Sequence, residues 1–116
     1  MPVDLTPSQA LGLWHAVTVQ QVHHDGRDLT LRQLAILLEI YLVPPPHTVR
    51  GLAAKLGVTK PVITRALDTM GEQGLVTRQR DERDKRNVVI KRTVDGALFL
   101  ERLGDLIIAT GRSQTS

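Results

Sequence analysis

The sequence predicts a mainly α-helical fold with one short β-hairpin. Apolar residues recur at helical spacing through most of the 116 residues. Two segments rich in β-branched residues, 75–80 and 87–92, flank a polar stretch, which is typical of a hairpin. A chain of this length can bury one hydrophobic core, and no segment has the composition of a linker. We therefore expect one domain over residues 1–116.

The composition excludes several classes of chemistry. The chain has no cysteine, so disulfides, thiolate nucleophiles and cysteine-metal sites are excluded. Its N-terminus shows no basic region followed by an apolar one, so no signal peptide is expected. The most apolar run, "LAILLEIYLV", covers about half a membrane span and contains Glu39. We expect a soluble, cytoplasmic protein without a membrane segment.

The charge is unevenly distributed. Residues 47–92 hold 11 Lys and Arg against 5 Asp and Glu, a net +6. The rest of the chain holds 4 against 7, a net −3. Such asymmetry favours an anionic partner for the middle of the chain, and a solvated basic face is the alternative interpretation.

Two helices are expected in the first part of the chain. Thr6 and Pro7 resemble an N-cap and a first helical residue, and they predict a helix to about His23. The segment "HDGRD", residues 24–28, predicts a turn. Thr30 then caps a central helix that the prolines at 44–46 end. Leu37 and Ile40 lie on its second side, and one face is expected to carry Leu31, Leu34, Ala35, Leu38, Tyr41 and Leu42.

Two short helices follow. Thr48 can cap a helix that runs to Leu56, where Gly57 suits a left-handed C-terminal residue. Thr59 is the next cap candidate, and the segment "KPVITRALDTMGEQG" predicts a helix that ends at Gly74. The residues expected to be buried on this helix are Ile63, Ala66, Leu67 and Met70.

Two short helices joined by a three-residue turn with glycine predict a helix-turn-helix. The second helix of such a pair enters the DNA major groove. Lys60, Thr64 and Pro61 are expected to meet base edges, and Arg65 and Arg50 to contact phosphate. The alternative is a helical hairpin that only fills a core. The outward face is predicted to carry Thr59, Lys60, Pro61, Thr64, Arg65 and Asp68.

The segment "TRQRDERDKRNVVIKR", residues 77–92, predicts a hairpin directly after the recognition helix, so the fold is a winged helix-turn-helix. Arg78 and Arg80 are expected to contact phosphate, and Arg83 and Arg86 to reach the minor groove. Asp84 is expected to pair with a neighbouring arginine, because interleaved carboxylates can orient crowded guanidinium groups. A solvated loop with weak surface ion pairs is the alternative.

A last helix is predicted from Val94 to about Thr110, capped by Thr93. Its apolar residues occupy more than one face, which favours self-association. We therefore expect the flanking helices, residues 1–24 and 94–110, to be used for dimerisation.

At residues 48–96 the chain resembles the MarR family of bacterial winged-helix transcription regulators. The similarity rests on "GLVTR", "RDERDKR" and "TVDG", and most specifically on the D-x-R-D-x-R pattern from Asp81 to Arg86. By position, Lys60, Thr64 and Arg65 match the recognition helix of the family, and Asp84 and Arg86 match the characteristic pair of its wing.

The resemblance implies a homodimer that binds a pseudo-palindromic operator in double-stranded DNA and responds to a small-molecule effector. Family members usually run some tens of residues longer, with extended terminal helices. The sequence-specific DNA-binding regulator is thus the first function hypothesis. A winged helix used for protein-protein interaction, without DNA specificity of its own, is the second.

Enzyme chemistry finds no support in the sequence. There is no glycine-rich phosphate loop, no carboxylate pair in an apolar setting and no Ser/His/Asp arrangement. We expect no catalytic residue, no metal site and no cofactor. His47 lies beside the helix-turn-helix and is a lesser candidate for a phosphate contact.

Overall fold

The computed structural model describes residues 4–23 and 27–115, and residues 24–26 of the predicted turn lie outside the described residues. The chain forms two compact units, residues 29–100 and residues 1–28 with 101–116. The expected fold class, mainly helical with a small antiparallel sheet, is confirmed. The elements in chain order are α1 (Pro7–His23), α2 (Leu31–Leu42), β1 (His47–Thr48), α3 (Val49–Leu56), α4 (Lys60–Glu72), β2 (Val76–Arg80), β3 (Val88–Arg92) and α5 (Val94–Thr115).

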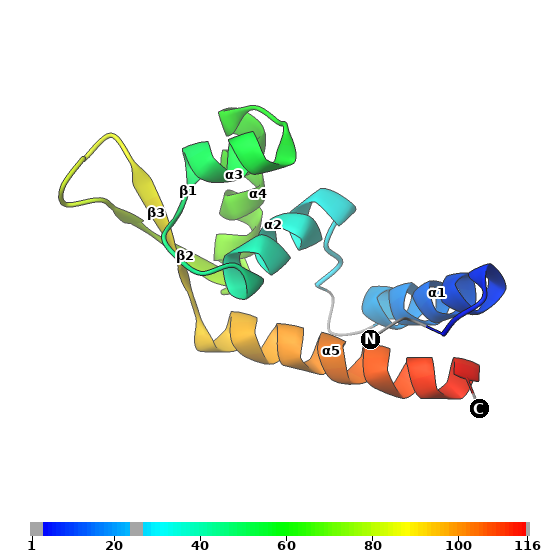
Figure 1. Cartoon of the computed structure of the whole chain (residues 1–116). Coiled ribbons are helices and arrows are strands. Elements are labelled where there is room, and N and C mark those ends of the chain that lie inside the picture. The colour runs from blue at the N-terminus through cyan, green and yellow to red at the C-terminus, as the bar shows by residue number, and fades with distance from the viewer. Residues whose placement is uncertain (1–3, 24–26, 116) are drawn as a thin grey trace. The chain divides into compact units, whose positions relative to one another are not determined.

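The unit of residues 29–100 holds α2, α3, α4 and a three-stranded sheet in the order β1-β3-β2 (Figure 1). Strands β2 and β3 form the predicted hairpin, with Val76 opposite Arg92 and Arg80 opposite Val88. Strand β1 was not predicted. It has two residues, too few to show an alternating pattern, and it pairs with β3 only because the folded chain brings them together.

The hydrophobic core of this unit lies under α2, α3, α4 and the sheet. The four positions predicted to be buried on α4 are all buried, so the spacing on that helix was interpreted correctly. The core is almost entirely aliphatic, because Phe99 is the single aromatic residue buried in it. Its buried members are Ile36, Leu37, Ile40, Leu52, Ala53, Ile63, Ala66, Leu67, Met70, Leu75, Val76, Ile90 and Phe99.

The buried face of α2 differs from the prediction. Leu31 and Leu42 were assigned to the main apolar face, yet they are 76% and 75% exposed. The fully buried side chains are Ile36, Leu37 and Ile40. Because α2 carries apolar residues nearly all round, the spacing of these residues does not indicate which face is buried. The position of α4 and the sheet decides which face of α2 is buried.

The predicted helix ends are confirmed at several positions. Thr30 and Gln33 form a reciprocal capping box at the start of α2. The Thr48 side chain accepts a hydrogen bond from the Gly51 amide at the start of α3, at 2.9 Å. Gly57 ends α3 with a φ of 67°, a left-handed conformation that glycine adopts without steric cost.

Tyr41 joins the end of α2 to the base of the hairpin. Its hydroxyl donates to the Leu75 carbonyl at 2.8 Å and accepts from the Thr93 amide at 2.9 Å. Gly96, in the first turn of α5, packs so closely here that a Cβ atom would overlap the Tyr41 hydroxyl and the Leu75 carbonyl oxygen. Thr93 caps α5 as predicted, by accepting from the Gly96 amide at 2.9 Å. This junction therefore requires glycine at position 96.

Arg92, the last residue of β3, fixes the other side of the same junction. Its guanidinium donates to the carbonyls of Ile40 at 2.8 Å and Val43 at 3.0 Å, two orphan acceptors at the end of α2. It also lies 5.8 Å from the ring centroid of Tyr41. The base of the hairpin is thus held by polar contacts between residues about 50 positions apart.

The second unit contains α1 and the later part of α5. Helix α5 ends at Thr115 rather than at the predicted Thr110. Glycine disfavours a helix interior by only about 1 kcal/mol, so Gly104 and Gly111 do not end it. The Gln9 side chain donates to the Gln114 carbonyl at 3.2 Å, and a Cβ atom on Gly12 would lie 2.7 Å from Oε1 of Gln114. Close contact with α1 thus accompanies the extra length of α5.

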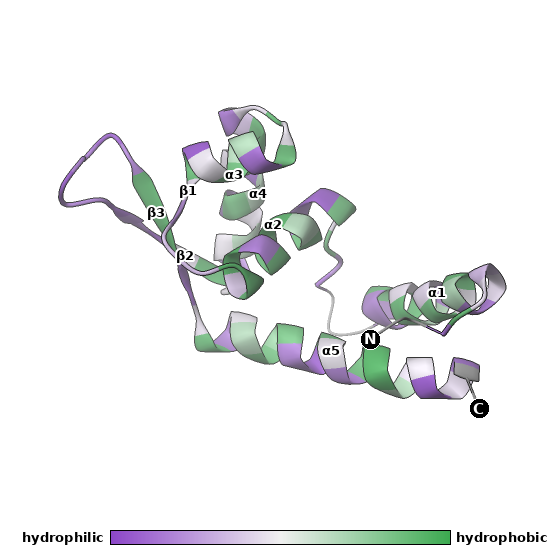
Figure 2. Cartoon of the chain, viewed as in Figure 1, coloured by the Kyte–Doolittle hydropathy of each residue, from purple (hydrophilic) through white to green (hydrophobic). Residues whose placement is uncertain are grey.

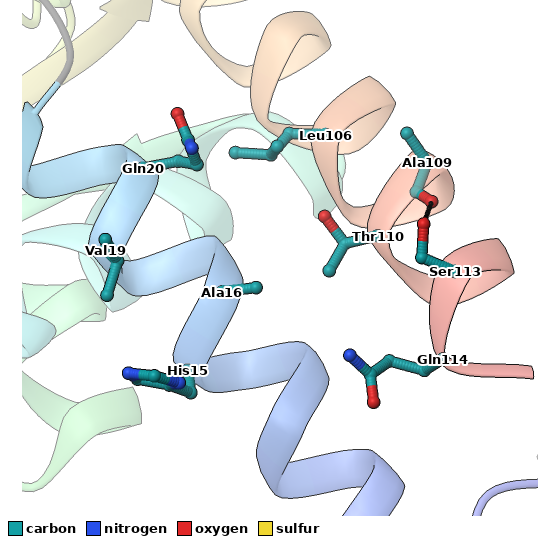
Figure 3. Close-up of a pocket in the computed structure, with 9 residues that line it drawn as sticks. All are labelled: His15, Ala16, Val19, Gln20, Leu106, Ala109, Thr110, Ser113 and Gln114. Carbon is teal, nitrogen blue, oxygen red and sulfur yellow. Dashed lines mark hydrogen bonds between the residues drawn. The ribbon is translucent and has the colours of Figure 1, made fainter.

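A hollow of about 500 Å³ lies between α1 and α5 within this unit. Figure 3 shows Thr110 and Gln114 pointing from α5 toward α1, and Ala16 pointing from α1 toward α5. Across residues 4–23 and 27–115, no helix is both long enough and apolar enough to cross a membrane.

Candidate nucleic-acid interface

Helix α4 presents a continuous polar face. Lys60, Pro61, Thr64 and Arg65 are all exposed, as predicted from their spacing. Thr59 takes the N-cap position, but its side chain makes no capping hydrogen bond, so its hydroxyl stays available. The side chains of Lys60, Thr64 and Arg65 make no hydrogen bond or ion pair to another described residue. These groups can therefore engage a ligand without breaking an internal contact.

The orientation of this polar face follows from the packing of α4. Ile63, Leu67 and Met70 are 0% exposed, and they fix the helix against the core. Because residues three and four apart share a helix face, the same spacing turns Lys60 and Thr64 to the solvent.

Asp68 also faces outward, but it has a partner that the sequence did not predict. Its Oδ1 lies 2.7 Å from Nη2 of Arg78, so the ion pair links α4 to β2. Arg78 was expected to contact phosphate, and in the structure its guanidinium is occupied by a carboxylate. The two side chains are 35% and 53% exposed, so solvent weakens the pair.

The turn of the hairpin is closed by backbone and Asx-type hydrogen bonds. The Asp81 amide donates to the Asn87 carbonyl at 3.0 Å, and the Asn87 amide donates to the Asp84 carbonyl at 2.9 Å. Asp81 accepts from the Arg83 amide at 2.9 Å through its side chain. The carboxylates that first look unsuited to an anion-binding hairpin thus shape its turn. Figure 2 shows that this turn is hydrophilic throughout.

Asp84 pairs with Arg86, as predicted for a neighbouring arginine. Its Oδ1 accepts from both the backbone amide and Nε of Arg86, each at 3.1 Å. The hydrogen bond from the Arg86 side chain, followed by that from its amide, lowers the pKa of Asp84, and the positive charge of Arg50 adds to the effect. Asp84 is therefore ionised at neutral pH, and it restrains the Arg86 guanidinium.

The other two hairpin arginines differ in their restraint. Arg80 donates from Nη1 to the Lys85 carbonyl at 3.2 Å. The guanidinium of Arg83 makes no hydrogen bond or ion pair within residues 4–23 and 27–115. Of the four arginines predicted on the hairpin, Arg83 is thus the one whose charge the described residues leave without a partner.

Several predicted residues meet in one place. A hollow of about 200 Å³ where α3, α4 and the hairpin meet is lined by Arg50, Lys60, Thr64 and Arg86. Thr48 and Asn87 line it too, and no sequence pattern predicted this. Arg78 and Arg80 lie on β2 and do not line this hollow.

The position of His47 argues against the predicted phosphate contact. It is 7% exposed, and Nε2 lies 2.8 Å from the Val43 carbonyl. Its position in β1 opposite Ile90 turns it into the protein, so the interpretation as a phosphate ligand was wrong.

Helices α3 and α4, with the hairpin that follows them, define a winged helix-turn-helix protein with a cationic face. The family model described as the MarR family matches residues 27–87, more than half of the chain. The chain belongs to the MarR family.

A curated relative is the organic hydroperoxide resistance transcriptional regulator of Bacillus subtilis (strain 168). It is 41% identical over 59 residues, which are 51% of this chain and 40% of the relative. The chain thus matches less than half the length of that relative.

Solved structures share the fold. A mutant of S. aureus MepR has a TM-score of 0.77 at 19% identity, over 97% of this chain and 83% of that chain. The structure of S. aureus MepR in complex with DNA has a TM-score of 0.69 at 19% identity, over 93% of this chain and 80% of that chain.

Proposed function

We propose that the chain is a sequence-specific regulator of transcription that binds double-stranded DNA in the cytoplasm. One observation carries this proposal. In a single compact unit, α4 exposes polar side chains without internal partners, and a cationic hairpin follows directly in the chain. Residues 47–92, which hold both elements, have a net charge of +6. A polyanion of regular shape is the partner that such a surface suits.

Membership of the MarR family supports the same function, since the curated relative is a transcriptional regulator. The MepR neighbour was solved in complex with DNA. On this proposal, the start of α4 enters the major groove, where a recognition helix reads base edges, and the hairpin contacts the backbone or the minor groove.

Binding to a random-sequence duplex tests the first part of the proposal. Each neutralised phosphate releases counterions, so the affinity should fall steeply between about 50 and 200 mM salt. A module that binds only proteins should show no such binding, and that result would contradict the proposal. Selection of bound sequences from a random pool tests specificity. If no sequence were enriched, the binding would be non-specific, and the proposed specificity would be wrong.

We also propose that the chain acts as a homodimer through the flanking helices. The apolar side chains Leu11, Val22 and Ile108 are 70%, 60% and 55% exposed on α1 and α5, which is costly in a monomer. A dimer should select a two-fold motif, because the symmetry of the operator mirrors that of the protein. Sedimentation at micromolar concentration measures the oligomeric state directly, and a monomer would contradict the proposal.

A small-molecule effector completes the proposed function. The hollow between α1 and α5, about 500 Å³, falls in the size range of ligand pockets. A bulky Thr110→Trp substitution should fill it and abolish any effector response while leaving duplex binding intact. Retention of the response would place the effector elsewhere.

A further inference from the structure

The basic hollow where α3, α4 and the hairpin meet combines three cations with polar neighbours. We use this name for the space of about 200 Å³ lined by Thr48, Val49, Arg50, Lys60, Thr64, Arg86, Asn87 and Val88. Since a water molecule takes about 30 Å³ in the liquid, the space holds several waters or one hydrated oxyanion. No acidic residue lines it, although the chain carries three acids in the adjacent hairpin turn.

The cations of the basic hollow are only partly neutralised by the described residues. Arg50 and Lys60 make no hydrogen bond or ion pair to a residue in the ranges 4–23 and 27–115. Asp84 is the carboxylate whose charge interacts with this group: it binds Arg86 and is influenced by Arg50. Three positive charges therefore face one negative charge, and an added anion would reduce their mutual repulsion.

The donors around the basic hollow suit an oxyanion. Arg50 and Lys60 supply charged N–H donors from two different helices, and the Thr64 hydroxyl is exposed beside them. Because the three cations come from α3, α4 and the hairpin, one bound oxyanion would contact all three elements of the winged helix at once.

We propose that the basic hollow binds one phosphate of the DNA backbone, with Arg50 and Lys60 as its main ligands. This inference rests on the proposed function. It changes the role of Lys60, which the sequence led us to expect at a base edge: Lys60 sets the register of the protein on the duplex, and the remaining exposed residues of α4 discriminate between bases.

The salt dependence of duplex binding separates the two roles of Lys60. Loss of one phosphate contact should reduce the slope of log affinity against log salt by about 0.9. We expect Lys60→Gln and Arg50→Gln each to lower the affinity about tenfold, equally for the selected sequence and for random duplex. Arg32→Gln, the same charge change at the exposed start of α2, is the matched control and should leave the slope unchanged.

Two outcomes of this experiment would overturn the proposal. An unchanged salt slope in Lys60→Gln would show that Lys60 neutralises no phosphate. A changed preference at one base position, found by repeating the selection with Lys60→Gln, would make Lys60 a base reader. Both residues are exposed, so the variants should fold, and circular dichroism checks this.

A shared ligand also predicts non-additive losses. If Arg50 and Lys60 bind the same phosphate, the double variant should lose clearly less affinity than the product of the two single losses. If the two residues contacted separate phosphates, the affinity loss of the double variant would equal the product of the two single losses. That result would contradict a single site.

Inorganic phosphate is the second probe, and it distinguishes this inference from the proposed function. Addition of phosphate should shift the NMR amide resonances of Thr48, Arg50 and Thr64 in the unaltered full chain, but not in Lys60→Gln. Chloride added to the same ionic strength is the reference and should cause no such shifts. Absence of these shifts in the unaltered chain would overturn the proposal even if the duplex binds. Shifts in a chain that binds no duplex would refute the proposed function, and they would replace the backbone phosphate with a free anion as ligand.

Discussion

Helix α4 and the hairpin both present cations, but they position them by different means. Lys60, Thr64 and Arg65 project from a helix that is fixed from below by fully buried aliphatic side chains. On the hairpin, Arg78, Arg80 and Arg86 are instead bound to acceptors of the same chain. Packing fixes the backbone of α4 and leaves these three side chains without partners among the described residues, whereas surface polar contacts restrain the arginines of the hairpin.

This difference has an energetic consequence. A buried core contact contributes several kcal/mol, whereas an exposed ion pair contributes about 0–1 kcal/mol. We therefore expect α4 to keep its orientation when DNA binds, and the hairpin arginines to exchange their internal partners for phosphate at low cost. The base of the hairpin is an exception, because Tyr41 and Arg92 tie it to α2.

The largest expected effect tests this exception. In Gly96→Ala, the new Cβ atom would overlap the Tyr41 hydroxyl and the Leu75 carbonyl oxygen. Relief of such overpacking should cost about 3 kcal/mol of unfolding free energy. Gly104→Ala is the matched control: beyond its chain neighbours and the backbone of its own helix, no atom of the described residues lies within 4 Å of the added Cβ, and alanine should stabilise the helix by about 1 kcal/mol. Urea denaturation measures the unfolding free energy of both variants. If Gly96→Ala were as stable as the unaltered chain, the junction would accommodate the added Cβ atom, and this prediction would be wrong.

The next effect concerns the tip of the hairpin. Replacing both Arg83 and Arg86 with alanine should lower duplex affinity about a hundredfold at about 100 mM salt, because two cations near phosphate are lost. The stability should hardly change, since both side chains are exposed. Arg102→Ala, an exposed arginine on α5, serves as the control. If the double variant bound the duplex as tightly as the unaltered chain, the tip of the hairpin would not contact DNA.

The Asp68–Arg78 pair should show a smaller effect. Both side chains are partly exposed, so a double-mutant cycle with Asp68→Ala and Arg78→Ala should give a coupling below about 1 kcal/mol in the unfolding free energy. Asp68→Asn should raise the affinity for random duplex severalfold, because it frees Arg78 and removes a negative charge from the exposed face of α4. A fall in affinity would mean that the pair positions the hairpin and that Arg78 makes no phosphate contact.

The smallest effect is a titration. The pKa of Asp84 is lowered mainly by the Arg86 side chain, so Arg86→Ala should raise it back toward the ordinary value. A carboxyl whose pKa is lower in the folded protein than in the unfolded chain stabilises the fold at every pH above its unfolded-state pKa. This stabilisation is lost as the pH falls through the folded-state pKa. The contribution of this pair should therefore be fully present and constant between pH 6 and 8, and should be lost only in acid. Carboxyl NMR shifts against pH measure the pKa, and equal midpoints in both proteins would contradict the assigned cause.

Much of the fold could be predicted from the sequence. The spacing of Ile63, Leu67 and Met70 identified the buried face of α4, and therefore also its exposed face with Lys60 and Thr64. The acidic and basic pattern of the turn indicated the Asp84 pair. The sequence did not indicate that Asp68 binds Arg78, because their ten-residue separation becomes a contact only when β2 packs beside α4. Nor did it indicate that His47 is buried, since the two residues of β1 carry no pattern.

By itself, the sequence determined where α2, α3 and α4 begin and where α2 and α3 end, because caps, prolines and the left-handed Gly57 act on the backbone within a few residues. It also determined the family, through the order of those elements and the motif of the hairpin. Only the tertiary structure decided which face of α2 is buried, which acid holds which arginine, and that Arg50 and Lys60 share one hollow. These choices depend on contacts between segments far apart in the chain, where local preferences have no influence.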